Sequence, residues 1–185
     1  MNIIKIRFSI FVALAAALLI LSGCDSGDPS GISPTDDKTQ DFASVDMTAA
    51  DIPADALAQH LLANVSFDDP NMVQMDAEIA QSLYNVAGLA DSVVSYGSTG
   101  ATAEAVLVIR CSSEENAVSA AEKVGKYRTE MAGVYASYNQ PESVKLTKAL
   151  LAQDGVYVVF CVSPDTAAAE KAYHDYVVSV VYPAG

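Results

Sequence analysis

The chain has 185 residues, a net charge of −13 at pH 7 and no tryptophan. This length is enough for one domain together with processing segments. A surface this acidic repels phosphate backbones and anionic lipid headgroups. The composition therefore argues against nucleic acid as a partner and against electrostatic adhesion to a membrane.

The N-terminal segment has the organisation of a secretory signal. Lys5 and Arg7 precede an uncharged apolar run over residues 8–21. A helix that crosses a bilayer needs about 20 residues, so a permanent anchor helix is the weaker interpretation. We expect residues 1–23 to be removed as a signal peptide. Removal leaves eight basic against 23 acidic residues, a net charge of −15.

The apolar run ends in Leu21, Ser22, Gly23 and Cys24, which resemble the lipobox of bacterial lipoproteins. The resemblance implies that signal peptidase II recognises the first three residues and cuts before Cys24. It also implies that Cys24 carries a covalent diacylglycerol, with palmitate-like chains and an optional N-acyl chain. Two or three chains hold a protein on a membrane far more firmly than one. We therefore expect a lipid-anchored protein at the outer face of the cytoplasmic membrane. The alternative is an ordinary cleaved signal that leaves Cys24 as a free thiol.

Residues 24–50 are expected to form the lipidated N-terminus and a disordered acidic linker. They are rich in Asp, Ser, Gly, Pro and Thr and contain few large apolar residues. Such a composition cannot bury enough apolar surface to offset the entropy cost of ordering. The aspartates also lack the spacing of a calcium-binding loop, so a spacer is favoured over a calcium site.

The next part of the chain predicts two helices followed by two strands. Pro53 suits the first turn of a helix that Asp51 caps, and a second helical stretch covers about residues 76–84. Residues 92–96 and 103–111 have strand patterns, and the segment between them has the composition of a turn.

A long helix and a second hairpin are predicted after these strands. Ser112 and Glu115 have the spacing of a capping box, and the apolar stripe that follows extends to Tyr138. Residues 144–153 and 156–163 flank an Asp-Gly pair, which is a strong hairpin signal. A last helix follows, which a Ser-Pro pair is expected to cap.

These elements predict a single globular α+β domain over residues 51–185. Their order is α-α-β-β-α-β-β-α, with about four strands in a mostly antiparallel sheet of two hairpins, and helices packed on the sheet. The run Ala105–Ile109 is apolar on both faces, which is typical of a central strand.

Several short motifs are spread over residues 70–180: Leu83–Val86, Ala103–Val106, Arg128, Tyr138–Glu142 and Gly155–Val158. In their order and spacing they resemble an uncharacterised bacterial lipoprotein family known as domain of unknown function 4358. The sequence departs from the family pattern at the position after Tyr84, where the resemblance implies glycine and Asn85 stands. Asparagine tolerates a left-handed backbone, so the turn can be kept. The resemblance implies a fold and a location, but no reaction.

Histidine and cysteine give few candidates for chemistry. His60 and His174 lie on separate predicted helices, and neither has a second His or Cys three or four residues away. Cys111 and Cys161 lie on predicted strands of a protein expected in an oxidising compartment. A disulfide between these two cysteines is one alternative, and two buried thiols are the other.

The nine tyrosines allow two interpretations. Tyr127, Tyr138, Tyr173 and Tyr176 fit the apolar stripes of helices, which favours core packing. An exposed tyrosine cluster would instead indicate a surface that binds carbohydrate or peptide.

The sequence contains no recognisable catalytic or metal-binding motif, and we assign no catalytic residue, no metal and no cofactor. We predict a non-enzymatic binding or accessory domain of the cell envelope, whose partner is an envelope protein or a glycan. The alternative is a cell-wall-directed hydrolase in which distant carboxylates converge.

Overall fold

The computed structural model describes residues 51–100 and 102–181, and its centre is a five-stranded antiparallel sheet. The strands are β1 (Val73–Met75), β2 (Ala90–Gly97), β3 (Ala105–Cys111), β4 (Leu150–Asp154) and β5 (Tyr157–Val162). Their order across the sheet is β1-β2-β3-β5-β4, and every neighbouring pair is antiparallel. The described residues all belong to one compact unit.

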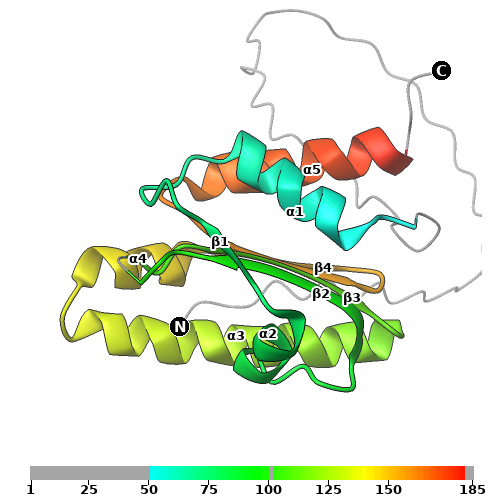
Figure 1. The fold of residues 1–185 in the computed structure, drawn as a ribbon, viewed down its shortest axis with the longest axis horizontal. Coiled ribbons are helices and arrows are strands. Elements are labelled where there is room, and N and C mark those ends of the chain that lie inside the picture. The colour runs from blue at the N-terminus through cyan, green and yellow to red at the C-terminus, as the bar shows by residue number, and fades with distance from the viewer. Residues whose placement is uncertain (1–50, 101, 182–185) are drawn as a thin grey trace, which may run out of the picture. The chain divides into compact units, whose positions relative to one another are not determined.

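Helices cover both faces of this sheet (Figure 1). The five helices are α1 (Ala54–Asn64), α2 (Ala77–Leu83), α3 (Glu114–Ala136), α4 (Gln140–Lys148) and α5 (Thr166–Val181). One face carries α1 and α5, and the opposite face carries α2 and α3, with α4 beside the C-terminal end of α3. The α+β class and the predicted order of elements are therefore confirmed.

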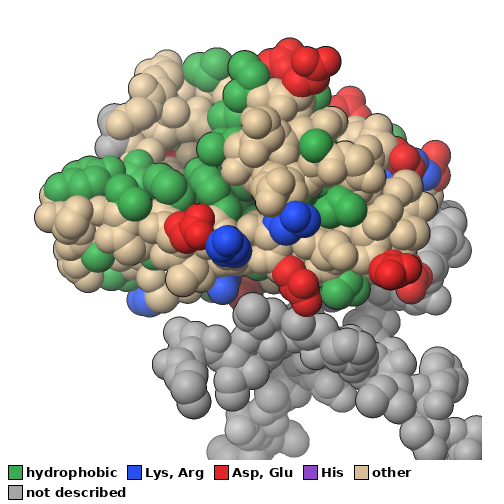
Figure 2. Space-filling model, turned by 90° about the horizontal axis from the view of Figure 1, so that it is seen from below, with side chains coloured by type: hydrophobic (Ala, Val, Ile, Leu, Met, Phe, Trp, Pro, Cys, Tyr) green, Lys and Arg blue, Asp and Glu red, His purple; other side chains and the backbone are tan. Residues whose placement is uncertain are grey.

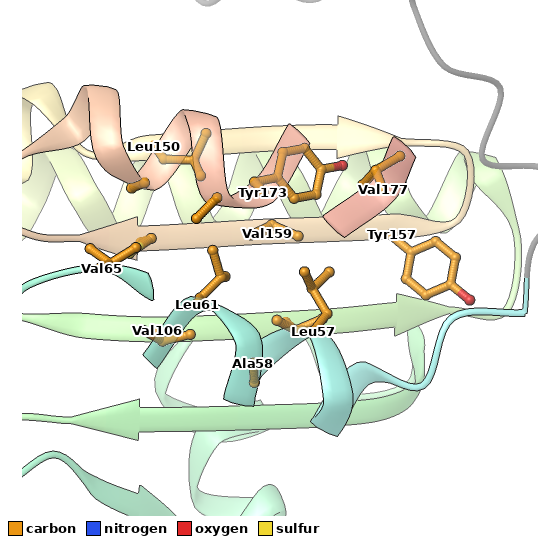
Figure 3. Close-up of a cluster of buried hydrophobic side chains, with 14 of the residues drawn as sticks. Leu57, Ala58, Leu61, Val65, Val106, Leu150, Tyr157, Val159, Tyr173 and Val177 are labelled. Carbon is orange, nitrogen blue, oxygen red and sulfur yellow. The ribbon is translucent and has the colours of Figure 1, made fainter. Parts of the chain in front are cut away.

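Two hydrophobic cores result, one on each side of the sheet, because β3 and β5 are apolar on both faces. Figure 3 shows the first core, where Leu57 and Leu61 of α1 and Tyr173 of α5 meet Val106 and Val159. The second core joins alternate residues of the same strands to α2, α3 and α4. Residues 106–109 of β3 are fully buried, which confirms the prediction of a central strand.

The sheet has a fifth strand that the sequence did not predict. β1 is only three residues long and pairs with β2 at one edge of the sheet, from Val73 opposite Gly97 to Met75 opposite Ser95. A segment this short cannot show the alternation of apolar and polar residues over four to eight positions by which a strand is recognised.

The prediction of a strand over residues 144–153 is wrong in its first half. Residues up to Lys148 form α4, with Pro141 in the first turn, and only β4 at Leu150–Asp154 belongs to the hairpin. Proline has a fixed φ that suits the first turn of a helix, so Pro141 begins a new helix after α3 ends. A two-residue hairpin turn is present, but Gly155 and Val156 form it, because Asp154 pairs with Tyr157 as the last residue of β4. Of the predicted Asp-Gly pair, Gly155 has a positive φ, at +53°, and Asp154 does not.

The predicted caps of three helices also need correction. Ser113, and not Ser112, caps α3 by accepting a hydrogen bond from the backbone N–H of Asn116. Asp165 accepts the corresponding bond in the first turn of α5. The N-cap position of α1 is Pro53, while Asp51 forms an ion pair with Arg110 at 3.5 Å. Within the described residues, no helix combines the length and apolar character needed to cross a bilayer.

Candidate binding groove and carboxylate cluster

A groove lies between β1 and the C-terminal half of α3. Its floor is made by Gly97 of β2 and Ala105 of β3, which are paired neighbours in the sheet. A methyl group added at Gly97 would meet no described heavy atom within 4 Å, so the space above it is open. Val73 pairs with Gly97 from the other side and forms the β1 wall, with 56% of the side chain exposed.

Two tyrosines form the opposite wall of the groove. The hydroxyl of Tyr135 donates a hydrogen bond of 3.3 Å to the carbonyl of Thr102, which places the ring beside the end of the β2–β3 loop. The ring of Tyr138 lies against that of Tyr135, with 5.2 Å between centroids, and Tyr138 is 67% exposed. Burial, the neighbouring Tyr138 and the Glu142 carboxylate raise the pKa of Tyr135, so the hydroxyl stays protonated at neutral pH.

Exposed apolar side chains are concentrated on this side of the molecule. Among the described residues, the large apolar side chains that are exposed are Val73, Ile79, Leu83, Val134, Tyr138 and Val144. Five of the six lie on β1, α2, α4 or the C-terminal half of α3, Tyr138 lies in the turn after α3, and none of the six lies on α1 or α5. Figure 2 shows hydrophobic side chains gathered toward one end of this face, beside a hollow in the surface.

A cluster of four carboxylates, three of which contact Lys145, lies at one end of the groove. The ammonium of Lys145 contacts Asp68 at 2.7 Å, Glu142 at 2.9 Å and Glu104 at 3.1 Å. Burial disfavours the charge of Lys145, but the three hydrogen bonds outweigh burial and raise its pKa above the usual value.

Backbone and hydroxyl donors satisfy the remaining oxygens of this carboxylate cluster. Glu104 is fully buried and accepts hydrogen bonds of 2.9 Å from the backbone N–H groups of Asp68 and Asp69. Glu142 accepts one of 2.8 Å from the backbone N–H of Ala103. These bonds tie the segment before β1 and the β2–β3 loop to α4, so the cluster fixes the shape of the groove's end.

Asp69 completes the cluster as an ionised carboxylate. The hydroxyl of Ser98 and backbone N–H groups of Asn71 and Thr99 hydrogen-bond to it and lower its pKa from 3.8 to about 2. Among the described residues, Lys145 is the single basic side chain in a cluster of four acidic side chains, and Asp69 is ionised at neutral pH. A general acid needs a raised pKa near the working pH, and Asp69 has the opposite shift.

The two cysteines predicted as alternatives for a disulfide are free thiols. Each lies on the apolar side of its strand, as strand parity predicted, but the two sides face different cores. Cys111 lies opposite Val156, whereas Cys161 pairs with Val106. The disulfide is therefore corrected to two buried thiols. Burial raises the pKa of Cys111 to about 11 and that of Cys161 to about 12.

The other predicted residues do not assemble into a site with the groove. His60 lies between α1 and α5, where its ring contacts that of Tyr176 with 4.9 Å between centroids. His174 lies 3.9 Å from the Asp175 carboxylate on α5. In the described part of the chain, no group of three or more His, Cys, Asp or Glu residues is arranged to hold a metal ion. Leu21, Ser22, Gly23 and Cys24 lie outside the described residues.

The tyrosine prediction is confirmed in part and wrong in part. Tyr173 is buried in the first core, and Tyr127 and Tyr176 are partly buried. Tyr138 is exposed, because α3 ends at Ala136 and Tyr138 lies in the turn that follows it. The apolar stripe therefore predicted core packing correctly as far as Met131, whereas Val134 and Tyr138 at its end are exposed.

Comparison with known proteins identifies a family but no relative of known activity. Neither the search of curated proteins nor that of solved structures gave a significant match. A family model matches residues 65–163, which is more than half of the chain and includes the groove and the whole carboxylate cluster. The chain therefore belongs to the family described as "Domain of unknown function (DUF4358)".

Proposed function

We propose that this protein is a lipid-anchored, extracytoplasmic binding domain that engages a partner through the groove between β1 and α3. The observation that carries the proposal is that, among the described residues, all six exposed large apolar side chains lie on the groove's side of the molecule. Exposed apolar surface is costly in water, and a concentrated patch marks a site of interaction.

The lipid anchor in this proposal rests on the sequence around Cys24. An acidic domain gains little from electrostatic contact with anionic lipid, so acyl chains are the means of anchoring that the chain's chemistry favours. We expect a Cys24→Ala variant to lose incorporation of an alkyne-tagged palmitate and to leave the membrane fraction. Labelling that persists in this variant contradicts the assignment.

Site-specific photo-crosslinking in intact cells tests the groove. A photoreactive phenylalanine analogue replaces Tyr138 in one strain and the exposed Glu170 of α5 in the control strain. The proposal expects one defined crosslinked species from position 138 that is absent from position 170. The same species at both positions, or none at either, counts against a binding role for the groove.

The rival function, a hydrolase that uses convergent carboxylates, has less support. Carboxylates do converge at one end of the groove, but Glu104 and Glu142 accept charged and backbone hydrogen bonds and are buried. Turnover of purified cell-wall material that is lost in an Asp69→Asn variant would favour the hydrolase instead.

A further inference from the structure

We propose that the occupant of the groove is an apolar peptide segment of a partner protein that carries lysine or arginine. This inference rests on the proposed function and adds the chemistry of the partner. It starts from the juxtaposition of an open apolar groove with a carboxylate cluster that has more negative than positive charge.

The shape of the groove suits apolar side chains. Gly97 has no side chain and Ala105 has only a methyl group, so the floor of the groove lies close to the backbone of the sheet. The exposed side chains of Val73 and Tyr138 lie on either side of it. An apolar side chain of a partner, placed over Gly97, would contact apolar residues and lose its contact with water. The removal of apolar surface from water is the main favourable contribution in most protein association. The tyrosines add polar hydroxyls at the rim and lose little conformational entropy on binding.

The charge of the groove suits a cationic partner. At the groove's end a single basic side chain, Lys145, lies among four acidic side chains, and Asp69 remains ionised down to about pH 2. Asp68 is 61% exposed, so an arriving cation can approach it. The exposed ring of Tyr138 offers a second favourable contact, since cations are attracted to the faces of aromatic rings. Lysine and arginine combine this charge with an apolar stem that can lie along the groove.

The same charge disfavours a second copy of the chain as the occupant. The described residues contain 17 acidic against seven basic side chains, so two copies repel each other as they approach. A neutral glycan could stack on the tyrosines, but it would gain nothing from the uncompensated carboxylates. Charge complementarity therefore favours a basic peptide segment.

Two glycine positions provide a matched pair of variants for the test. Gly97→Leu fills the open space over the groove floor, and Gly133→Leu adds the same side chain at an exposed position on α3. A Cβ at either position meets no heavy atom within 4 Å, and neither backbone has a positive φ. Both variants are therefore expected to fold, which circular dichroism and urea unfolding can verify.

The probe is a fluorescein-labelled decapeptide of alternating leucine and lysine, titrated by fluorescence polarisation. The protein is the chain from residue 24 onward with Cys24→Ala, so that acyl chains do not interfere. Control peptides replace every lysine by glutamate, or every leucine by serine. We expect the leucine–lysine peptide to bind at least about tenfold more tightly than either control peptide, with binding that weakens as salt is raised.

We further expect Gly97→Leu to weaken this binding about tenfold or more and Gly133→Leu to leave it unchanged. Equal binding by both variants would overturn the proposal, because the peptide would then be adhering to acidic surface at large. Equal binding of the lysine and glutamate peptides would overturn it as well. Soluble peptidoglycan fragments are the third probe. If they bind the wild-type protein and Gly97→Leu abolishes that binding, the proposal is also overturned, because the occupant is then a glycan. If crosslinking at position 138 succeeds while basic peptides fail, the groove is a binding site and only the partner's chemistry is wrong.

Discussion

Lys145 is the residue that contributes most to the stability of the carboxylate cluster at the groove's end. Its side chain is 11% exposed and lies between three carboxylates that come from the segment before β1, from the end of the β2–β3 loop and from α4. Removal of one partner of a buried ionic network leaves uncompensated buried charge, and this costs more than the pair contributes when intact.

Replacement of Lys145 by methionine keeps most of the apolar stem and removes the charge. We expect Lys145→Met to lower the free energy of unfolding by about 3–5 kcal/mol, measured by urea denaturation at pH 7. Lys126→Met is the matched control, because Lys126 is 77% exposed and pairs only with Glu130 across one helical turn. The control should change stability by less than about 0.5 kcal/mol. Similar losses in the two variants would show that the Lys145 cluster contributes no more than a surface pair.

Asp69 gives the fold a predictable response to acid. Its pKa is about 2 in the folded protein, against an ordinary value of 3.8 for the unfolded chain, so the folded state favours the ionised form. The stability that Asp69 contributes is present above pH 3.8 and is lost as pH falls through 3.8 toward 2.

Urea unfolding across the acid range should reveal this contribution. We expect stability to fall less steeply between about pH 4 and pH 2 in an Asp69→Asn variant than in the wild-type chain, because the variant lacks the linked protonation. Parallel curves for the two proteins would mean that Asp69 does not carry the acid sensitivity.

At the scale of single elements, the turn between α2 and β2 illustrates a family feature that sequence reasoning interpreted correctly. Asn85 has φ +55°, in the left-handed region, where the family pattern implied glycine. The side chain of the preceding Tyr84 lies in the second core, where its ring meets Tyr127 with 4.7 Å between centroids. The turn therefore positions an aromatic ring on which α2 and α3 pack.

Two substitutions at Asn85 separate backbone strain from side-chain effects. We expect Asn85→Ala to cost about 1 kcal/mol of stability, because alanine is strained at this φ, whereas Asn85→Gly should be close to neutral. Thermal unfolding of the pair provides the measurement. A glycine variant that is destabilised as much as the alanine variant would assign the effect to the asparagine side chain.

Elements with strong periodic patterns were predictable from the sequence, and elements defined by tertiary contacts were not. β3, β5 and α3 have long apolar patterns, and all three form where expected. β1 is too short for such a pattern, and its strand geometry depends on pairing with β2. The sequence could not separate α4 from a strand, because Val144 and Leu146 fit either period in so short a segment.

The candidate site was harder to predict than the fold, because its parts are far apart in the chain. Glu104 and Glu142 lie within two of the family motifs, yet only the structure shows that both bind Lys145. Tyr138 belongs to the helical stripe that predicted core packing, and its exposure depends on where the core ends. A signal was present in the excess of apolar residues at the end of α3, where a solvated helix end would be polar.

For the molecule as a whole, stability should not depend on the redox state of its cysteines. Cys111 and Cys161 lie on opposite sides of the sheet, each within its own core. We expect the urea midpoint to be unchanged by dithiothreitol, and the unfolded, unreduced chain to take up one carbamidomethyl group at each of these thiols. Mass spectrometry of the alkylated protein provides the measurement. Protection of both thiols in the unfolded chain would contradict the free-thiol arrangement.

β3 connects the two ends of the domain and determines how it would bear a mechanical load. Ala105 at one end of the strand forms the groove floor, and Arg110 near the other end pairs with Asp51, where the chain enters α1 (Figure 1). If the lipid anchor proposed above holds the N-terminus, a pull on a partner in the groove would act between the two ends of β3, along the strand axis. The hydrogen bonds of β3 to β2 and β5 are perpendicular to that axis. Tension along the axis would therefore load all of these bonds in shear at the same time. The domain would therefore resist detachment under tension, with a lifetime set by its unfolding rate.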